Sequence, residues 1–270
     1  AIIEANNFNI PTLMLQHGLH TRKTFNNHPG HKNDLPKFTK GALFGKQTEK
    51  IMAEAGFLKE QLKVTGSPQW DYIFDYVMDK NISRKNMGIK EGNSVVTIIM
   101  DPINPEMGKL FLHEIFTSFL SYKAITLIFK LHPTGYSGDR KMVWKLSSEL
   151  NYKNDIIVTR NRDLTEALYL SEFAITVQSS AGIDTVLMGK PLVSLNLFED
   201  LDRSPYLGTD NVISLTKTGE LEPIVYKLLN DQKFRSRINE RNSDFIEKYA
   251  FRNDGLASSR VSDLVEELSA

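Results

Sequence analysis

The sequence predicts an α/β protein whose carboxyl-terminal part is a doubly wound parallel sheet. From Ser94 to Leu197, short apolar runs rich in β-branched residues alternate with segments of helical periodicity. Most of these runs are apolar at nearly every position, which is typical of parallel strands that helices cover on both faces. The chain has 270 residues and 41% hydrophobic content, enough for one large core or two modest ones. We therefore expect one or two domains.

The amino-terminal part predicts a smaller, partial α/β unit. Residues 1–9 read as the end of a helix, as though more of a longer protein preceded them, and residues 10–15 as a buried strand. Residues 19–40 show no periodicity and are expected to form a long loop. The other expected elements are a strand at 41–45, a helix at 47–55, a strand at 61–65 and a helix at 69–78.

A polar segment separates the two predicted units. Residues 80–93 are rich in Lys, Asn and Gly and poor in apolar residues, so we expect a linker there. This places residues 1–85 in the smaller unit with its linker and residues 86–270 in the larger unit with the carboxyl-terminal helices. The strands expected in the larger unit are 94–100, 124–133, 155–159, 173–177 and 191–197.

The composition excludes several classes of protein. Thirty-three basic residues balance thirty-three acidic ones, so no overall charge draws the chain to nucleic acid. The chain has no cysteine, which excludes disulfides and thiolate metal sites. His20, His28 and His31 lie in the expected loop, but no carboxylate cluster keeps a ligand spacing with them, so we expect no metal. A cytoplasmic protein without a nucleic-acid partner is the default expectation.

His17 is the first candidate functional residue. It follows an expected strand and precedes Gly18, so it stands where ligands approach a parallel sheet, at the carboxyl end of a strand. A histidine there can act as a general base near neutral pH, and the glycine lets a substrate come close to the backbone. The alternative is a histidine that only shapes a loop.

Two further candidate sites lie at the ends of expected strands in the larger unit. His132 and Pro133 follow a buried strand, where the imidazole can donate to a phosphate, although a purely structural histidine fits equally well. Ser179 and Ser180 lie in a small polar turn between a strand and a helix. Their hydroxyls and the free backbone N–H groups of the helix start can hold a phosphate, and the alternative is that one serine caps the helix.

The fourth candidate site is a turn near the carboxyl terminus. Arg252, Asp254 and Gly255 precede the last expected helix, which carries Ser258 near its start. This turn can bring polar groups to a ligand, or it can be an ordinary helix cap that follows an Asp-Gly turn.

Taken in chain order, these motifs resemble a known family. The chain is similar, over nearly its whole length, to the two-domain GT-B transferases of bacterial surface polymers. Within them it is closest to the CDP-glycerol glycerophosphotransferase and capsule polysaccharide synthesis group. The matching stretches are QHG (16–18), VTGSPQWD (64–71), KLHP (130–133), LTEALYLSEFAITVQSSAGIDTVLMGKPLVSLN (164–196) and DGLASSRV (254–261).

The resemblance implies a GT-B glycosyltransferase of surface polysaccharide or glycoconjugate synthesis. It implies that the Rossmann-like larger unit binds a nucleotide-activated donor, with His132, Ser179 and Ser180 near the phosphates, and that His17 faces the acceptor as a base. The other donor-binding residues that it implies are Gly66, Ser67, Pro68, Pro133, Asp184 and Ser258.

The same resemblance sets expectations for the ligands. Bacterial sialyltransferases share a similar His-Pro and Ser-Ser pairing for CMP donors, so we expect a CMP- or CDP-linked donor. We expect no separate cofactor, and a glycan or a lipid-linked molecule as acceptor. A lipid-linked acceptor allows peripheral association of the full-length protein with the inner face of the membrane.

Departures from the family pattern leave alternatives. Glycerophosphotransferases typically show Trp-His-Gly-Thr and Gly-Tyr-Pro-Arg-Asn-Asp, whereas residues 16–19 read QHGL and 66–71 read GSPQWD, which favours a sugar over glycerol phosphate as the transferred group. UDP-N-acetylglucosamine 2-epimerases are similar in architecture, but residues 178–184 (QSSAGID) lack their paired carboxylates for proton transfer. A non-catalytic nucleotide-sugar-binding fragment is the third alternative, because most of a usual amino-terminal domain of the family is missing from the chain.

Overall fold

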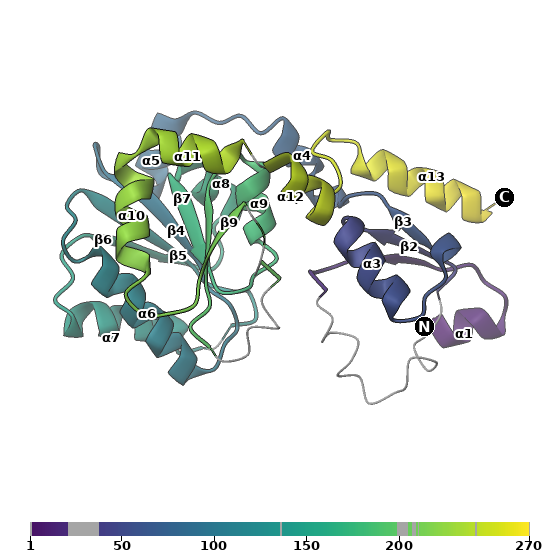
Figure 1. The fold of residues 1–270 in the computed structure, drawn as a ribbon, viewed down its shortest axis with the longest axis horizontal. Coiled ribbons are helices and arrows are strands. Elements are labelled where there is room, and N and C mark those ends of the chain that lie inside the picture. The colour runs from purple at the N-terminus through teal and green to yellow at the C-terminus, as the bar shows by residue number, and fades with distance from the viewer. Residues whose placement is uncertain are drawn as a thin grey trace. The chain divides into compact units, whose positions relative to one another are not determined.

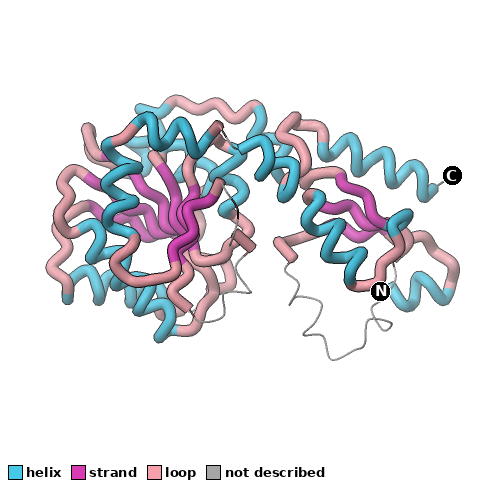
Figure 2. The backbone as a smooth tube through the Cα atoms, in the orientation of Figure 1, coloured by secondary structure: helices cyan, strands magenta, loops and turns pink. Residues whose placement is uncertain are grey.

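The computed structural model describes residues 2–20, 38–135, 137–198, 205, 206, 209, 211–240 and 242–269. The chain divides into two compact units, and each contains one parallel β-sheet (Figure 1, Figure 2). The smaller unit comprises Ala1–Tyr76 with Ser243–Ala270, and the larger unit comprises Val77–Asn242. Most of the long loop expected at 19–40, with His28 and His31, lies outside the described residues.

The boundary between the units corrects the sequence-based expectation of 1–85 and 86–270. The expected linker contains a helix, α5 (Lys80–Met87), because Asp79 accepts hydrogen bonds from the N–H groups of Asn81 and Ile82 at its start. Gly88 ends the helix in the left-handed conformation, with φ 75°. Met87 is buried against the larger sheet. The helix was missed because few of its residues are apolar.

The last two helices were also assigned to the wrong unit, since α12 (Asn242–Tyr249) lies in the smaller unit apart from its first residue. The last helix, α13 (Ala257–Ser269), belongs with the smaller unit, because the Asp71 carboxylate accepts hydrogen bonds from the N–H groups of Ala257 and Ser258 at 2.8 and 2.7 Å. Arg260 adds a second attachment, since its Nε donates to the carbonyl of Thr65 at 2.7 Å. Both attachments join residues that are nearly 200 positions apart in the sequence.

The larger sheet has six strands in the order β6-β5-β4-β7-β8-β9, and all neighbouring pairs are parallel. The five expected strands are confirmed, and the sequence analysis missed the sixth, β9. The strands are β4 (Ser94–Ile99), β5 (Ile125–Lys130), β6 (Asp155–Thr159), β7 (Phe173–Thr176), β8 (Leu192–Leu195) and β9 (Val212–Leu215).

Helices cover both faces of this sheet (Figure 1). Alternate strand residues point to opposite faces, so Val96 packs with residues of α6, α7 and α10, whereas Val95 packs with residues of α5 and α8. The fully buried phenylalanines 111, 116, 119 and 129 fill the first of these two layers. The other helices of the larger unit are α6 (Pro105–Phe119), α7 (Asp139–Glu149), α8 (Leu164–Leu170), α9 (Gly182–Leu187), α10 (Leu221–Asn230) and α11 (Gln232–Asn239).

The smaller sheet has three parallel strands in the order β1-β2-β3. Phe38, Leu43, Met52 and Leu62 form its buried cluster. Its elements are α1 (Ile2–Asn7), β1 (Leu13–Leu15), β2 (Lys40–Leu43), α3 (Lys46–Glu54), η1 (Lys59–Gln61), β3 (Leu62–Val64), η2 (Pro68–Trp70) and α4 (Asp71–Phe74).

Two expectations for this unit were wrong in detail. Strand β1 is not buried throughout, since the Leu15 side chain is 55% exposed. The helix expected at 69–78 ends at Phe74, and Val77 is 86% exposed rather than part of an apolar face.

Candidate functional site

The strand order of the larger sheet defines where a ligand can approach. The chain runs outward from β4 to β5 and β6, then returns to β7 on the other side of β4. In sheets of this order, ligands bind at the carboxyl ends of the strands, beside the point where the direction of winding reverses. That point lies between β4 and β7. Asp101 follows β4 there, and Ser179 and Ser180 follow β7.

His132 approaches the same edge from the other side of β4. It follows β5, and β5 and β7 both pair with β4. Neighbouring strands are about 4.8 Å apart, so the two loops leave the sheet about 10 Å from each other. The structure thus brings His132, Pro133, Ser179 and Ser180 to one edge of one sheet.

The turn after β7 is held by the carboxylate of Asp101. Its Oδ2 accepts hydrogen bonds from Thr176 Oγ1 at 3.0 Å, Val177 N at 3.1 Å and Gln178 N at 3.2 Å. The Thr176 hydroxyl in turn accepts from the N–H of Ser179 at 3.3 Å. Residues 178–181 are half-buried, so this fixed turn remains accessible to a ligand.

Asp101 is almost entirely buried, and this burial raises the pKa of its carboxyl group to about 6 from the usual 3.8. The hydrogen bonds from Gln178, Thr176 and Val177 oppose the shift. The sequence analysis missed Asp101. The available signal was an acidic residue placed directly after a buried strand at the reversal point of the sheet.

The far side of the turn is closed by two buried side chains. Tyr206 donates a hydrogen bond from its hydroxyl to the carbonyl of Ser179. A β-carbon added at Gly182 would lie 2.7 Å from that hydroxyl and 2.8 Å from Cδ2 of Leu192. Glycine at this position therefore lets α9 begin immediately against Tyr206 and Leu192.

The helix expected after the serine turn is confirmed, but α9 has only six residues. Asp184 lies in its first turn and is half-buried. Because so short a helix has a small dipole, an anion at this edge depends on directed side-chain and turn donors rather than on the helix.

His132 presents a defined hydrogen-bond donor. Its Nδ1 lies 3.2 Å from the N–H of Thr134, which can only donate, so Nδ1 accepts and the ring proton of the neutral imidazole is on Nε2. Burial, then the charges of Arg160 and Lys130, lower the pKa of His132. The imidazole is therefore neutral near pH 7 and carries its N–H on the nitrogen that faces away from Thr134.

Two cations flank this histidine. Arg160 follows β6 and donates from Nη1 to the carbonyl of Pro133 at 2.9 Å and to the carbonyl of His132. Lys130 donates from Nζ to the carbonyl of Arg160 at 2.6 Å, and burial lowers its pKa. These contacts make the end of β5 and β6 positively charged, which suits a phosphate. The sequence analysis did not find Arg160, because nothing local indicates that it reaches the His-Pro loop.

In the smaller unit, His17 follows β1 and its side chain is exposed. The preceding residue, Gln16, is buried and fixes the turn. Its Oε1 accepts from Phe44 N at 2.7 Å, and its Nε2 donates to the carbonyl of Gly18 at 2.8 Å and to Thr48 Oγ1 at 3.0 Å. The expected position of His17 at the carboxyl end of a strand is confirmed.

The structure also brings together the Gly66-Ser67-Pro68 turn and the turn before α13. Gly66 has φ +78°, and a β-carbon there would lie 3.1 Å from the carbonyl of Ala250. Arg260 joins the two turns, since it donates to Thr65 O and forms a bidentate pair with Asp254 at 2.9 Å. The hydrogen bond from Arg260 lowers the pKa of Asp254. Ser67 is buried, and Ser258 is exposed with its N–H bound to Asp71.

The predicted site residues thus fall into two groups. His17, Gly66, Ser67, Pro68 and Ser258 belong to the smaller unit, and His132, Pro133, Ser179, Ser180 and Asp184 belong to the larger unit.

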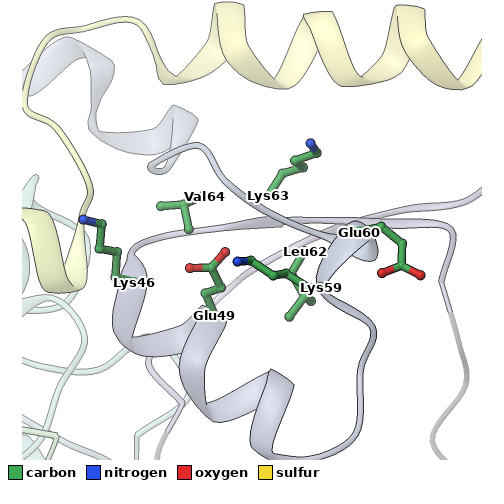
Figure 3. A pocket seen from close by; sticks show the side chains of 7 residues that line it. All are labelled: Lys46, Glu49, Lys59, Glu60, Leu62, Lys63 and Val64. Atoms are coloured by element: carbon green, nitrogen blue, oxygen red, sulfur yellow. The ribbon is translucent and has the colours of Figure 1, made fainter.

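A cavity of about 630 Å³ lies in the smaller unit beside α3 and β3 (Figure 3). None of the predicted site residues lines it. The side chains of Glu49 and Lys59 extend toward one another within it. Its lining residues are Lys46, Glu49, Lys59, Glu60, Leu62, Lys63 and Val64. The mixture of lysines and glutamates gives the cavity no clear preference for an anion or a cation.

The described residue ranges contain no group of three or more His, Asp or Glu side chains placed to hold a metal ion. None of their helices is long and apolar enough to cross a membrane.

Comparison with known proteins places these features in context. Residues 105–197 match the family model for capsule polysaccharide biosynthesis proteins. The matched segment runs from α6 through β8 and includes His132, Ser179 and Ser180. It confirms, over this part of the chain, the resemblance to the capsule polysaccharide synthesis group. No curated protein sequence matches the chain.

Solved structures show the fold class. A UDP-GlcNAc 2-epimerase from Neisseria meningitidis, bound to UDP-GlcNAc, matches 99% of this chain and 72% of its own, with TM-score 0.70 and 15% identity. The wall teichoic acid polymerase TagF matches 96% of this chain and 68% of its own, with TM-score 0.68 and 15% identity. The Anabaena protein HepE, in complex with UDP and glucose, matches 98% and 74%, with TM-score 0.64 and 14% identity.

The expected fold class is therefore confirmed: the chain is an α/β protein of the GT-B-like kind, with two parallel sheets. At 14–15% identity these structures define the fold and leave the reaction open.

Proposed function

We propose that the protein is a glycosyltransferase that uses a nucleotide-activated sugar in the synthesis of a surface polysaccharide or glycoconjugate. The observation that carries this proposal is the set of phosphate donors at the carboxyl edge of the larger sheet. His132 offers a neutral Nε2–H beside Lys130 and Arg160, and on the other side of β4 the turn at the reversal point offers the hydroxyls of Ser179 and Ser180. The match of residues 105–197 to the capsule polysaccharide biosynthesis model supports the assignment.

These residues have distinct proposed roles in the transfer. An acceptor hydroxyl attacks the anomeric carbon of the donor sugar while the bond from that carbon to the donor phosphate oxygen breaks. His17 takes the proton of the hydroxyl. The departing nucleotide keeps the bonding electrons, and His132 and Ser180 donate hydrogen bonds to its phosphate. Gly66, Ser67, Pro68, Pro133, Asp184 and Ser258 are the further proposed donor contacts.

A CMP- or CDP-linked donor is the finer part of the proposal. It rests on the motif resemblance, whereas two of the similar structures are bound to UDP-GlcNAc or to UDP and glucose. We further propose that the protein acts in the cytoplasm, without a metal or separate cofactor. We place it at the inner face of the membrane where its acceptor is lipid-linked.

Calorimetry with CMP, CDP and UDP tests the donor site. A hydrogen bond to a charged phosphate contributes roughly 1.5–3 kcal/mol, so His132→Ala and Ser180→Ala should each weaken binding about ten- to hundredfold. The matched controls are His113→Ala on α6 and Ser148→Ala on α7, which remove exposed residues of the same types from the same unit. Equal nucleotide affinity in wild type and both site variants would show that the phosphate does not bind at this edge of the sheet.

Turnover assays separate the proposed transferase from its alternatives. With the full-length enzyme, nucleotide release should require an acceptor, and His17→Ala should lower turnover by about 10²-fold or more at nearly unchanged donor affinity. Conversion of UDP-GlcNAc without an acceptor would instead identify an epimerase, which the match to such enzymes keeps as the second candidate. Nucleotide binding without either reaction would identify a non-catalytic binding module.

A further inference from the structure

We infer that Asp101 is a positioning residue, whose carboxylate holds the turn carrying Ser179 and Ser180 in its ligand-binding shape. This inference rests on the proposed function, because it concerns the same edge of the larger sheet. It assigns no contact between Asp101 and the ligand.

The contacts of the Asp101 carboxylate lie at the end of β7. One oxygen, Oδ2, receives hydrogen bonds from three consecutive residues, Thr176, Val177 and Gln178, at 3.0–3.2 Å. Two of these donors are backbone N–H groups just past the last paired residue of β7, since the pairing of β4 with β7 ends at Ile99 and Thr176. The carboxylate therefore accepts the backbone N–H groups that lie just beyond the pairing of β4 with β7, and it fixes the backbone at the end of β7.

The contacts of Asp101 continue into the serine turn. The Thr176 hydroxyl donates to Asp101 and accepts from the N–H of Ser179. From Asp101 to Ser179 the turn is thus a connected network of hydrogen bonds, and such networks hold a single geometry when every member is satisfied. The Ser180 hydroxyl makes no hydrogen bond within the described part of the chain, so it is available to a ligand.

A carboxylate occupies this position, although a neutral hydrogen-bond acceptor could bind the same donors. A buried ionised group is unfavourable unless several donors satisfy it, and here the donors come from the ligand-binding turn itself. Glu114 provides the internal comparison. It lies on α6, is similarly buried and accepts a backbone N–H, but its donor is Gly219, at 2.7 Å, and not a residue of the serine turn.

The test compares Asp101→Ala, Asp101→Asn and the control Glu114→Ala. Calorimetry with CMP, CDP and UDP gives nucleotide affinity, and hydrogen exchange of the Val177 and Gln178 amides reports on the turn. We expect Asp101→Ala to speed exchange at both amides and to weaken binding about tenfold or more. Asp101→Asn should restore both properties, because its amide oxygen can accept the same three hydrogen bonds. Glu114→Ala should leave both unchanged.

Two outcomes would overturn the inference while the proposed function stands. In the first, wild type binds a nucleotide and Asp101→Ala binds it equally well. In the second, Asp101→Ala weakens nucleotide binding no more than Glu114→Ala does, and hydrogen exchange at Val177 and Gln178 is unaltered. That result would show a general loss of stability and no specific effect on the turn. Failure of wild type to bind CMP, CDP or UDP is a different result, because it overturns the proposed function and this inference with it.

Discussion

The turn after β1 and the turn after β7 are built alike but held by different chemistry. Each follows a parallel strand, and each is fixed by one buried polar side chain that forms hydrogen bonds with backbone groups. In the smaller unit this side chain is the amide of Gln16, which both donates and accepts. In the larger unit it is the carboxylate of Asp101, which only accepts when ionised. The amide is satisfied at any pH, whereas the carboxylate makes the stability of its unit depend on pH.

The largest expected difference between the two turns is therefore a pH effect. Because the pKa of Asp101 is raised from 3.8 to about 6, the folded protein binds this proton more tightly than the unfolded chain does. The contribution of Asp101 to stability is present below pH 3.8 and is lost as the pH rises through about 6. The shift corresponds to about 3 kcal/mol.

Urea unfolding of wild type and Asp101→Asn at pH 4 and pH 7.5 measures this loss. Asparagine cannot ionise, so the variant should gain stability relative to wild type as the pH rises between these values. A difference between the two proteins that stays constant with pH would show that the Asp101 carboxyl titrates normally in the fold.

The second prediction concerns the neutral turn. Gln16→Ala removes three hydrogen bonds and leaves the N–H of Phe44 without its acceptor in a buried position, so we expect a loss of about 2–3 kcal/mol in unfolding free energy. The loss should be the same at pH 5 and pH 8. Gln69→Ala, at an exposed position of the same unit, is the control and should change little. A pH-dependent loss at Gln16 would contradict the contrast drawn between the turns.

The third prediction compares the glycines of the two turns. Gly182→Ala places a β-carbon under 3 Å from the fully buried Tyr206 and Leu192, which should destabilise the larger unit by about 1–2 kcal/mol. Gly18→Ala meets nothing within 4 Å and should be nearly neutral. Thermal unfolding of both variants checks the pair, and equal melting temperatures would show that Tyr206 and Leu192 can move aside.

The smallest expected effect is on the pKa of His132, which depends on the charges around it. Arg160→Gln removes a cation that lowers the pKa of this histidine, so the pKa should rise. Arg160→Lys keeps the charge and should leave the pKa close to the wild-type value. NMR titration of the imidazole measures both, with Arg162→Gln as a control that removes an arginine without a part in the shift. An unchanged pKa in Arg160→Gln would assign the lowering to burial and Lys130.

Local sequence patterns were sufficient for most of the larger sheet. Its five apolar runs became strands, and the positions of His132 and Ser179 followed because residues after such strands lie at the ligand-binding edge. Asp101 was not predictable in the same way. A single aspartate before a proline is common in loops, and its partners are about 75 positions further along the chain. The same holds for Arg160, which acts through a loop 27 or 28 positions earlier.

The predicted boundary between the two units was wrong for a related reason. Composition described Lys80–Met87 correctly as polar, but a helix needs few apolar residues when only Ser83 and Met87 are buried. The return of the last helix depends on Asp71 and Arg260, whose contacts span 186 to 195 positions and leave no local pattern.

The packing of α13 on the smaller unit has a consequence for synthesis of the protein. Residues 1–76 leave the ribosome before the larger unit does, yet Asp71 and Thr65 receive their partners from residues 257–260, after the entire larger unit has been made. Vectorial synthesis therefore lets the larger unit fold while the smaller one still lacks its final helix. The smaller unit is thus translated before the larger one but completed after it, so a nascent chain holds the smaller unit without α13 while the larger unit folds.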